Sequence, residues 1–140
     1  EKTKTDFHSP YGCSKGVADQ YVIDYSRIYG IKSVVMRQSC IYGYRQFGIE
    51  DQGWVAWFII ASLLEKEITI YGDGYQTMDM IFGADIGVAN LAAMDNDECK
   101  NIFLNVGTGI QTSVLDLLNL IKYQMDFLTR LIWEKFKHYG

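Results

Sequence analysis

The chain has 140 residues, enough for one domain with a hydrophobic core, and 49% of them are hydrophobic, as in a globular protein. Its 13 basic and 17 acidic side chains leave a formal net charge of −4, whereas nucleic-acid binding favours a basic surface, so we expect no nucleic-acid partner. The longest apolar run, residues 54–64, is interrupted only by Ser62 and is too short to span a membrane. No secretory signal opens the chain, so we expect a cytoplasmic protein with no membrane partner.

The first predicted element is a helix that begins near Pro10. Proline suits a first helical turn, Ser9 before it is a good N-cap, and Gly30 is a natural stop. Apolar residues at helical spacing predict that one face of this helix is buried. These residues are Val17, Tyr21, Val22, Tyr25 and Ile28.

A strand, a loop and a second helix follow. Residues 32–41 form a short, β-rich apolar run, which is typical of a buried parallel strand. A loop rich in glycine and aromatic residues occupies 42–48. Residues 53–66 are mostly apolar and predict a helix that is largely covered.

Short strands alternate with helices in the second half of the chain, which predicts an α/β fold. Strands are expected at 68–71, 78–82 and 102–106, and Ser113 is placed to cap a helix that begins at residue 114. A helix of small residues is expected at 84–94. Its expected packing side consists of Ala84, Val88, Ala89, Leu91 and Ala92. Helical spacing also predicts a helical tail, through Leu128, Leu131, Ile132 and Phe136.

Tyr11 and Lys15 carry the first chemical signal. They lie four residues apart at the start of the first helix, so their side chains share one face. A tyrosine phenol is ordinarily a weak base, and an ammonium group one turn away favours its ionised form. Such a pair can take a proton from a sugar hydroxyl and return it. Since the chain has ten tyrosines, this spacing also arises easily by chance, and the surrounding segments must decide.

Several segments in the same order resemble one family. Residues 9–21, SPYGCSKGVADQY, resemble the active-site helix of extended short-chain dehydrogenase/reductases, in the form typical of CDP-paratose (CDP-tyvelose) 2-epimerases. Further matches are a strand that ends in Arg37, a YG loop, DQGWV at 51–55, IYGDGYQTMD at 70–79 and NVGTG at 105–109. The resemblance covers roughly residues 6–121, and the chain is similar to the C-terminal part of an NAD-dependent epimerase/dehydratase.

The resemblance implies a fold and a reaction. It implies the end of a Rossmann-type doubly wound domain with the active-site helix over 6–52, mixed substrate-binding and Rossmann elements over 53–121, and an unmatched tail over 122–140. It implies NAD as the cofactor, a nucleotide-sugar as the substrate (a CDP-dideoxyhexose in the 2-epimerase subgroup), and a possible homo-oligomer for the complete protein. The implied reaction is transient oxidation to a keto sugar, which is then reduced from its other face.

The resemblance also implies the site residues. Tyr11 and Lys15 are the expected catalytic pair, and both are expected to contact the cofactor. Arg37 and Ser39 are further expected cofactor contacts. The expected substrate contacts are Cys40, Arg45, Gln46 and Met78. The three cysteines are too few and too widely spaced for a disulfide framework or a zinc site, so we expect reduced thiols and no metal.

Some features depart from the family pattern. The family usually has Asn or Ser where Cys40 stands and Arg where Met78 stands, so a charge-assisted contact to a diphosphate is missing. The chain contains neither a glycine-rich phosphate loop nor the catalytic Ser or Thr expected upstream of the tyrosine, so we expect it to be inactive by itself. Two alternatives stay open: a degenerate family member that has lost the reaction, and another enzyme of the same fold, such as a 4-epimerase or a 4,6-dehydratase.

Overall fold

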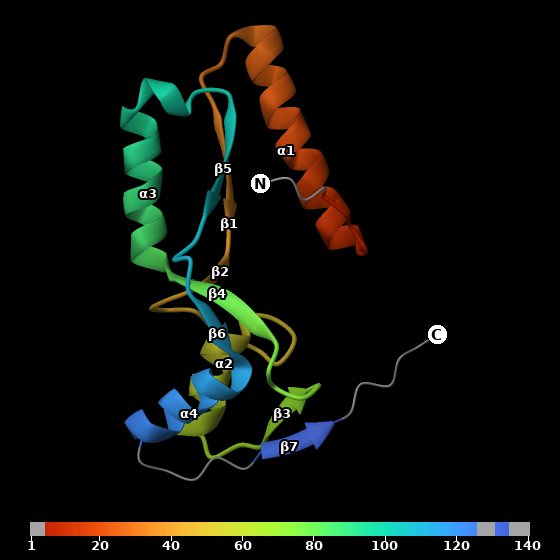
Figure 1. Cartoon of the computed structure of the whole chain (residues 1–140), viewed down its shortest axis with the longest axis vertical. Coiled ribbons are helices and arrows are strands. Elements are labelled where there is room, and N and C mark those ends of the chain that lie inside the picture. The colour runs from red at the N-terminus through yellow and green to blue at the C-terminus, as the bar shows by residue number, and fades with distance from the viewer. Residues whose placement is uncertain (1–4, 126–130, 135–140) are drawn as a thin grey trace. The chain divides into compact units, whose positions relative to one another are not determined.

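The computed structural model describes residues 5–125 and 131–134 (Figure 1). The chain divides into two compact units: the first comprises Glu1–Arg37 and Gly87–Val106, and the second comprises Gln38–Ile86 and Gly107–Gly140. Both units contain helices and short strands, as the expected α/β fold requires. None of the helices in the described part of the chain is long and apolar enough to cross a membrane.

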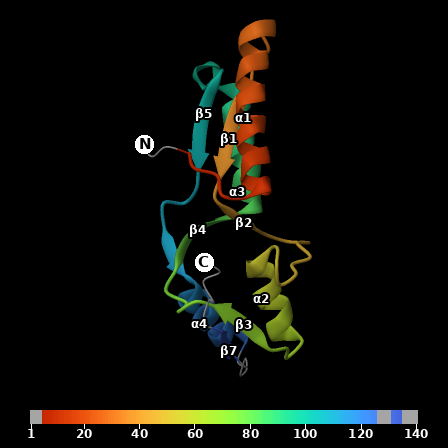
Figure 2. The ribbon, with the colours of Figure 1, turned by 90° about the vertical axis from the view of Figure 1, so that its right-hand side faces the viewer.

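The first unit contains helix α1 (Pro10–Tyr29) and strand β5 (Ile102–Val106), together with a short 3-10 turn, η1 (Asp97–Cys99). It also contains most of strand β1 (Val34–Gln38) and most of helix α3 (Gly83–Asp95). Strands β1 and β5 form a two-stranded sheet, and their arrows point in the same direction in Figure 2. The strand predicted at 102–106 is therefore confirmed.

Both ends of α1 lie where the sequence places them. Ser9 Oγ accepts a hydrogen bond from the Gly12 amide at 3.0 Å, and Pro10 occupies the first helical turn. At the other end Gly30 has a φ of 68°, and its amide donates to the Ser26 carbonyl. A left-handed residue that closes the last turn is the usual glycine cap, so both cap predictions are confirmed.

The buried face of α1 is not the one that the apolar stripe predicted. All five stripe residues are exposed, from 41% for Val22 to 63% for Tyr21. The side chains that α1 does bury or half-bury are Gly12, Gly16, Asp19, Ile23 and Ser26. The prediction was wrong because helical spacing fits either face, and here the small and polar face makes the contacts with the rest of the unit.

Helix α3 shows a similar difference. Ile86 and Ala93 are buried and Ala89 is half-buried, whereas Val88 and Leu91 are 66% and 62% exposed. Of the expected packing residues only Ala89 is partly covered; the other four, Ala84 and Ala92 included, are exposed. Small apolar residues occur on every side of this helix, so their spacing does not select one face.

The second unit contains a three-stranded sheet in the order β2-β4-β6. Strand β2 (Cys40–Tyr42) runs parallel to β4 (Thr77–Phe82), which runs antiparallel to β6 (Gln111–Ser113). The single strand predicted at 32–41 is thus two strands in different sheets, since the chain changes its pairing partner around Ser39. The strands predicted at 68–71 and 78–82 are confirmed.

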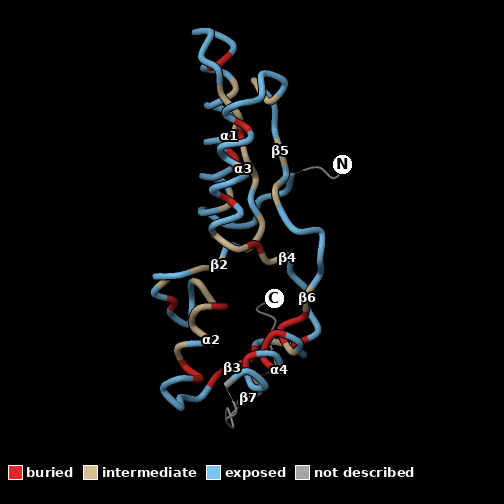
Figure 3. The backbone as a smooth tube through the Cα atoms, turned by 90° about the vertical axis from the view of Figure 1, so that its left-hand side faces the viewer, coloured by how far each residue is buried: buried red, intermediate tan, exposed pale blue. Residues whose placement is uncertain are grey.

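The core of the second unit lies between helix α2 (Trp54–Leu63), strand β3 (Ile68–Tyr71) and helix α4 (Val114–Met125). Figure 3 shows buried backbone gathered in these three elements. Helix α4 is amphipathic and contributes its apolar face to this core. The Asp116 amide donates a hydrogen bond to Ser113 Oγ at 3.0 Å, which confirms the predicted cap. The buried cluster consists of Val55, Phe58, Ala61, Ile68, Ile70, Val114, Leu117, Leu118 and Ile121.

The tail differs from the expected helix. Helix α4 ends at Met125, and Leu131–Glu134 form strand β7, which pairs with β3 in parallel. The helix prediction is wrong for Leu131 and Ile132, because pairing with β3 stabilises a strand more than a short helical pattern of apolar residues stabilises a helix. Leu128 and Phe136 lie outside the described residues.

Candidate active site

Tyr11 and Lys15 lie together at the start of α1. Lys15 Nζ is 5.4 Å from the centre of the Tyr11 ring, and the Tyr11 side chain is 69% exposed. Neither the Tyr11 hydroxyl nor the Lys15 ammonium group has a hydrogen-bond or ion-pair partner among the described residues. The helix start therefore presents a phenol and an ammonium group that are both available to a ligand.

The segment before α1 is held by Phe7. A Cβ atom at Gly16 would lie 2.2 Å from the Phe7 ring, so the ring rests directly on the backbone of α1 at this glycine. A Cβ atom at Gly12, one turn earlier, would also lie within van der Waals distance of Phe7. This contact and the Ser9 cap hold the approach to the first turn, where Tyr11 lies.

Arg37, an expected cofactor contact, has partners within the first unit. Its Nε donates to Asp19 Oδ2 at 2.7 Å, and its guanidinium carbon lies 4.6 Å from the centre of the Phe103 ring. The two charged side chains are 36% and 21% exposed, so the pair is partly withdrawn from water. In this structure the guanidinium group connects α1, β1 and β5.

Ser39 belongs to the second unit, where it contacts Asp79. Ser39 Oγ donates to Asp79 Oδ1 at 3.2 Å. The same carboxylate accepts bonds from the amide and hydroxyl of Thr108, at 2.9 Å each, and from the Gly109 amide at 2.7 Å. The backbone hydrogen bond from Thr108 is the main cause that lowers the pKa of Asp79, and the Gly109 bond adds to it.

The contacts of Asp79 were not apparent from the sequence, because they join residues that lie far apart in the chain. Its partners Thr108 and Gly109 follow it by about thirty residues. The sequence feature that could have indicated a close contact at this turn is the glycine on each side of Thr108. A Cβ atom at Gly107 would lie 2.7 Å from the Asp79 carboxylate, and Gly109 has a φ of 77°.

The second unit contains a mostly apolar pocket of about 590 Å³. Tyr42 from β2, Met80 from β4 and Thr108 contribute to its wall, together with Val55 of α2 and Leu117 of α4. It is large enough for part of a small-molecule ligand. Its apolar lining suits the flat face of a base or a sugar better than a phosphate group.

Met78, an expected substrate contact, lies on β4 two residues before the pocket residue Met80. Alternate residues of a strand point to the same face, so Met78 shares the face of Met80. Met78 is paired in register with Thr112, which also lines the pocket, and its side chain is 44% exposed. Residue 78 is therefore paired with one lining residue of this pocket, and its side chain carries no charge.

Cys40 lies on β2 in the same unit and is half-buried. It is paired in register with Met80 and packs against the hydrophobic cluster beside Trp54. Burial raises the pKa of its thiol, so the thiol stays protonated at neutral pH. The other two cysteines are also free.

Arg45 and Gln46 occupy the loop after β2. Arg45 is exposed, adopts a left-handed φ of 61°, and has no hydrogen-bond or ion-pair partner among the described residues. Gln46 instead turns inward: its Nε2 donates to the Ile41 carbonyl at 3.3 Å, and its Oε1 is buried without a partner in the described structure. Arg45 is thus free to meet a ligand, whereas Gln46 braces the loop.

Gly48 fixes the path of this loop against α2. A Cβ atom at Gly48 would lie 2.4 Å from the Trp57 amide nitrogen and 2.5 Å from the Gly53 carbonyl oxygen. Both are backbone atoms at the start of α2, so no side chain can move aside to make room. The sequence showed a glycine-rich loop, but not which glycine permits this contact.

Comparisons with known proteins agree with these features. Residues 1–107 match the model of the NAD dependent epimerase/dehydratase family. CDP-paratose 2-epimerase from Salmonella typhi is 44% identical over 133 residues, which is 91% of this chain and 39% of the relative. A putative UDP-glucose 4-epimerase from Methanocaldococcus jannaschii is 39% identical over 127 residues, 91% of this chain and 41% of the relative.

Solved structures show the same similarity. UDP-glucose 4-epimerase from Thermotoga maritima, solved with UDP-glucose, has a TM-score of 0.85 at 32% identity and covers 96% of this chain and 43% of its own. UDP-glucuronic acid 4-epimerase from Bacillus cereus, solved with NAD, has a TM-score of 0.86 at 26% identity, over 96% of this chain and 44% of its own.

These similarities establish that the chain belongs to the NAD dependent epimerase/dehydratase family. The family and the α/β fold expected from the sequence are confirmed, and the solved relatives share the Rossmann-type fold. The chain spans about two fifths of the length of the relatives it matches.

Proposed function

We propose that the complete protein containing this chain is an NAD-dependent sugar-nucleotide epimerase, and that this chain supplies its catalytic tyrosine and lysine. The observation that carries the proposal is the Tyr11–Lys15 pair at a capped helix start, with both polar groups unpaired in the described structure.

The residues present fit one end of the proposed cofactor. Tyr11 and Lys15 offer a hydroxyl and an ammonium group, which are suitable partners for ribose hydroxyls, and nothing in the described structure competes for them. When bound, NAD would supply the hydride acceptor for oxidation of a sugar carbon. Ser39 remains a proposed contact, although its hydroxyl also donates to Asp79.

In the proposed reaction Tyr11 removes the proton from the sugar hydroxyl that is oxidised and returns it when the keto sugar is reduced. Lys15 holds the ribose and places its ammonium group 5.4 Å from the centre of the Tyr11 ring. The exposed position of Tyr11 supports this role, since the phenol must reach a substrate hydroxyl within hydrogen-bond distance.

The substrate that we propose is a CDP-dideoxyhexose, epimerised at C2. The support is the 44% identity to CDP-paratose 2-epimerase from Salmonella typhi. Cys40, Arg45, Gln46 and Met78 are the proposed substrate-side residues. The apolar pocket beside Met78 and the unpaired guanidinium group of Arg45 are compatible with a base and a diphosphate, respectively.

A 4-epimerase acting on a UDP-sugar is the second candidate. The 39% identity to a putative UDP-glucose 4-epimerase and the TM-score of 0.85 to the UDP-glucose 4-epimerase of Thermotoga maritima favour it. The cytoplasmic location, the possible homo-oligomer and the assignment of 6–52 and 53–121 to the domains of a complete enzyme stay predictions.

A substrate panel tests the proposal. The complete protein, with its NAD-binding half, is incubated with CDP-paratose, UDP-glucose and dTDP-glucose, and the products are identified by proton NMR. We expect the 2-epimer of CDP-paratose as the main product. Turnover of UDP-glucose to its 4-epimer, with none of CDP-paratose, would establish the second candidate. No turnover of any substrate by a folded, NAD-loaded protein would overturn both.

A further inference from the structure

Helix α1 has few apolar contacts that define its orientation. Of the residues on its covered face, Gly12 and Gly16 have no side chain, Asp19 and Ser26 are polar, and Ile23 is the single large apolar residue. Small side chains permit close approach but interlock weakly, so apolar packing by itself leaves the rotation of the helix about its axis poorly determined.

Polar contacts connect α1 to the rest of the first unit at two places. At the C-terminal end of α1 the Ser26 hydroxyl contacts the Ile31 carbonyl and the side chain of Asn101. In the middle of the helix the Asp19 carboxylate receives the Arg37 guanidinium group at 2.7 Å. Arg37 lies on β1 and is also stacked over Phe103 of β5 at 4.6 Å, so it is held from two strands.

We propose that Asp19 and Arg37 are positioning residues that set the rotation of α1 on the β1–β5 sheet, and thereby place Tyr11 and Lys15 for catalysis. This inference rests on the proposed function, and it replaces a direct cofactor contact as the role of Arg37. A guanidinium group that is paired with a carboxylate and stacked on a ring has a fixed orientation, which a lysine at the same place does not provide.

The geometry of the helix explains how the pair acts on the site. Lys15 and Tyr11 lie four and eight residues before Asp19, which is about 6 Å and 12 Å along the axis at a rise of 1.5 Å per residue. All three side chains are within roughly a quarter turn of one another, since each step of four residues adds about 40°. Any rotation that the ion pair prevents would therefore move Tyr11 and Lys15 together, away from a substrate hydroxyl.

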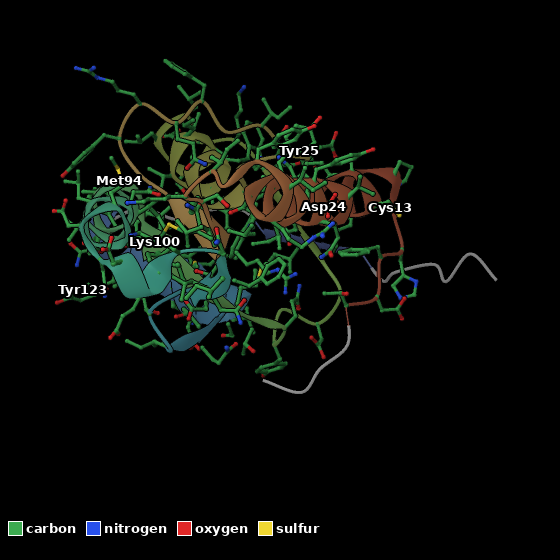
Figure 4. The ribbon with its side chains drawn as sticks, turned by 90° about the horizontal axis from the view of Figure 1, so that it is seen from above. Cys13, Asp24, Tyr25, Met94, Lys100 and Tyr123 are labelled. Carbon is green, nitrogen blue, oxygen red and sulfur yellow. The ribbon has the colours of Figure 1, made fainter. Side chains whose placement is uncertain are left out.

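The same helix contains a matched control. Arg27 Nη2 and Asp24 Oδ1 form an ion pair at 2.7 Å, but their side chains are 72% and 52% exposed, and both residues belong to α1 itself. Figure 4 shows Asp24 among the side chains that extend from α1. This pair does not connect the helix to the sheet, and exposed pairs of this kind contribute little.

The test uses Asp19→Asn, Arg37→Met and their combination in the complete enzyme, with Asp24→Asn and Arg27→Met as controls. We expect each of the first two to lower kcat by about tenfold to a hundredfold, because small displacements of catalytic groups are costly. The combination should be no worse than either single change, and the NAD Kd should stay within about threefold. Asp19→Glu, which keeps the carboxylate, should restore most of kcat, and the controls should match the wild type.

Hydrogen exchange of the α1 amides supplies a readout that does not need activity. We expect faster exchange over residues 11–22 in Asp19→Asn and Arg37→Met, and no change in the two controls. If the wild-type enzyme turns over no nucleotide-sugar, the proposed function fails, and the exchange data still decide whether the pair holds α1. If a variant does not fold, Arg37→Lys takes its place, because lysine keeps the positive charge but lacks the guanidinium group that stacks on the Phe103 ring.

Two results would overturn the inference. In one, Arg37→Met weakens NAD binding tenfold or more while Asp19→Asn does not, and Arg37 is then a cofactor ligand. In the other, kcat and the α1 exchange rates stay at wild-type values in all variants, and the pair then has no positioning role.

Discussion

The carboxylate of Asp79 accepts two hydrogen bonds from Thr108, one from its backbone amide and one from its hydroxyl, both at 2.9 Å. Asp79 lies on β4, and Thr108 lies in the turn before β6. Since Thr108 also lines the apolar pocket, this carboxylate ties one side of the pocket to the central strand of the sheet.

Asp79 makes the stability of the second unit depend on pH. Its pKa is held below the ordinary value, so the carboxylate stabilises the fold at pH values above about 3.9, the ordinary aspartate pKa. This contribution is lost as the pH falls through the folded-state pKa. We expect Asp79→Asn to lower Tm at neutral pH, and the difference from wild type to shrink below about pH 4.

Thermal melts of the two proteins between about pH 7 and pH 3 check this expectation. Asp73→Asn is the control, because Asp73 accepts one bond, from the Tyr75 amide within its own turn. A Tm difference between Asp79→Asn and the wild type that stays constant over the whole pH range would contradict the proposed link between the ionisation of Asp79 and stability.

Alanine substitution at Gly48 and at Gly87 should change the free energy of unfolding in opposite directions. Gly48→Ala places a methyl group against the backbone at the start of α2, and we expect it to destabilise the protein by about 1–3 kcal/mol. Gly87→Ala lies in α3 with no atom within 4 Å of the new Cβ, so it should stabilise by up to about 1 kcal/mol through helix propensity. Urea unfolding of both variants measures the two signs, and a stabilised Gly48→Ala would refute the described loop.

The catalytic pair predicts two different kinetic signatures in the complete enzyme. Tyr11→Phe removes the proton carrier and keeps the ring, so kcat should fall by about 10² to 10⁴ while NAD binding changes little. Lys15→Met should lower kcat and weaken NAD binding together, because the ammonium group has two proposed tasks. Steady-state kinetics and NAD titration separate the two outcomes. Turnover within about threefold of wild type in Tyr11→Phe would show that another group moves the proton.

Residue 78 should control the affinity for the diphosphate of the substrate. Met78 is uncharged and paired in register with the pocket residue Thr112, and Arg45 is unpaired in the described structure. We expect Met78→Arg to tighten nucleotide-sugar binding by roughly tenfold and Arg45→Ala to weaken it by a similar factor, about 1.4 kcal/mol each.

Titration of the complete enzyme with a CDP-sugar gives the Kd values for this comparison, and a neutral free sugar is the control ligand. If Arg45→Ala changes nothing and Met78→Arg abolishes binding, the diphosphate is not bound by residues 45 and 78.

Local features of the molecule were determined by the sequence itself. The α1 caps at Ser9 and Gly30 and the Tyr11–Lys15 spacing depend on residues within a few positions of one another, so local geometry is sufficient to predict them. The same holds for the short strands at 68–71 and 102–106, which are bounded by turn residues.

Tertiary structure decided everything that depends on a distant partner. The covered face of α1 follows from Arg37 and Asn101 rather than from its own apolar stripe. The role of Asp79 requires a turn about thirty residues later, and the tail becomes a strand because β3 offers it a ladder. In each case several local arrangements have similar free energies, and a contact from far along the chain selects among them.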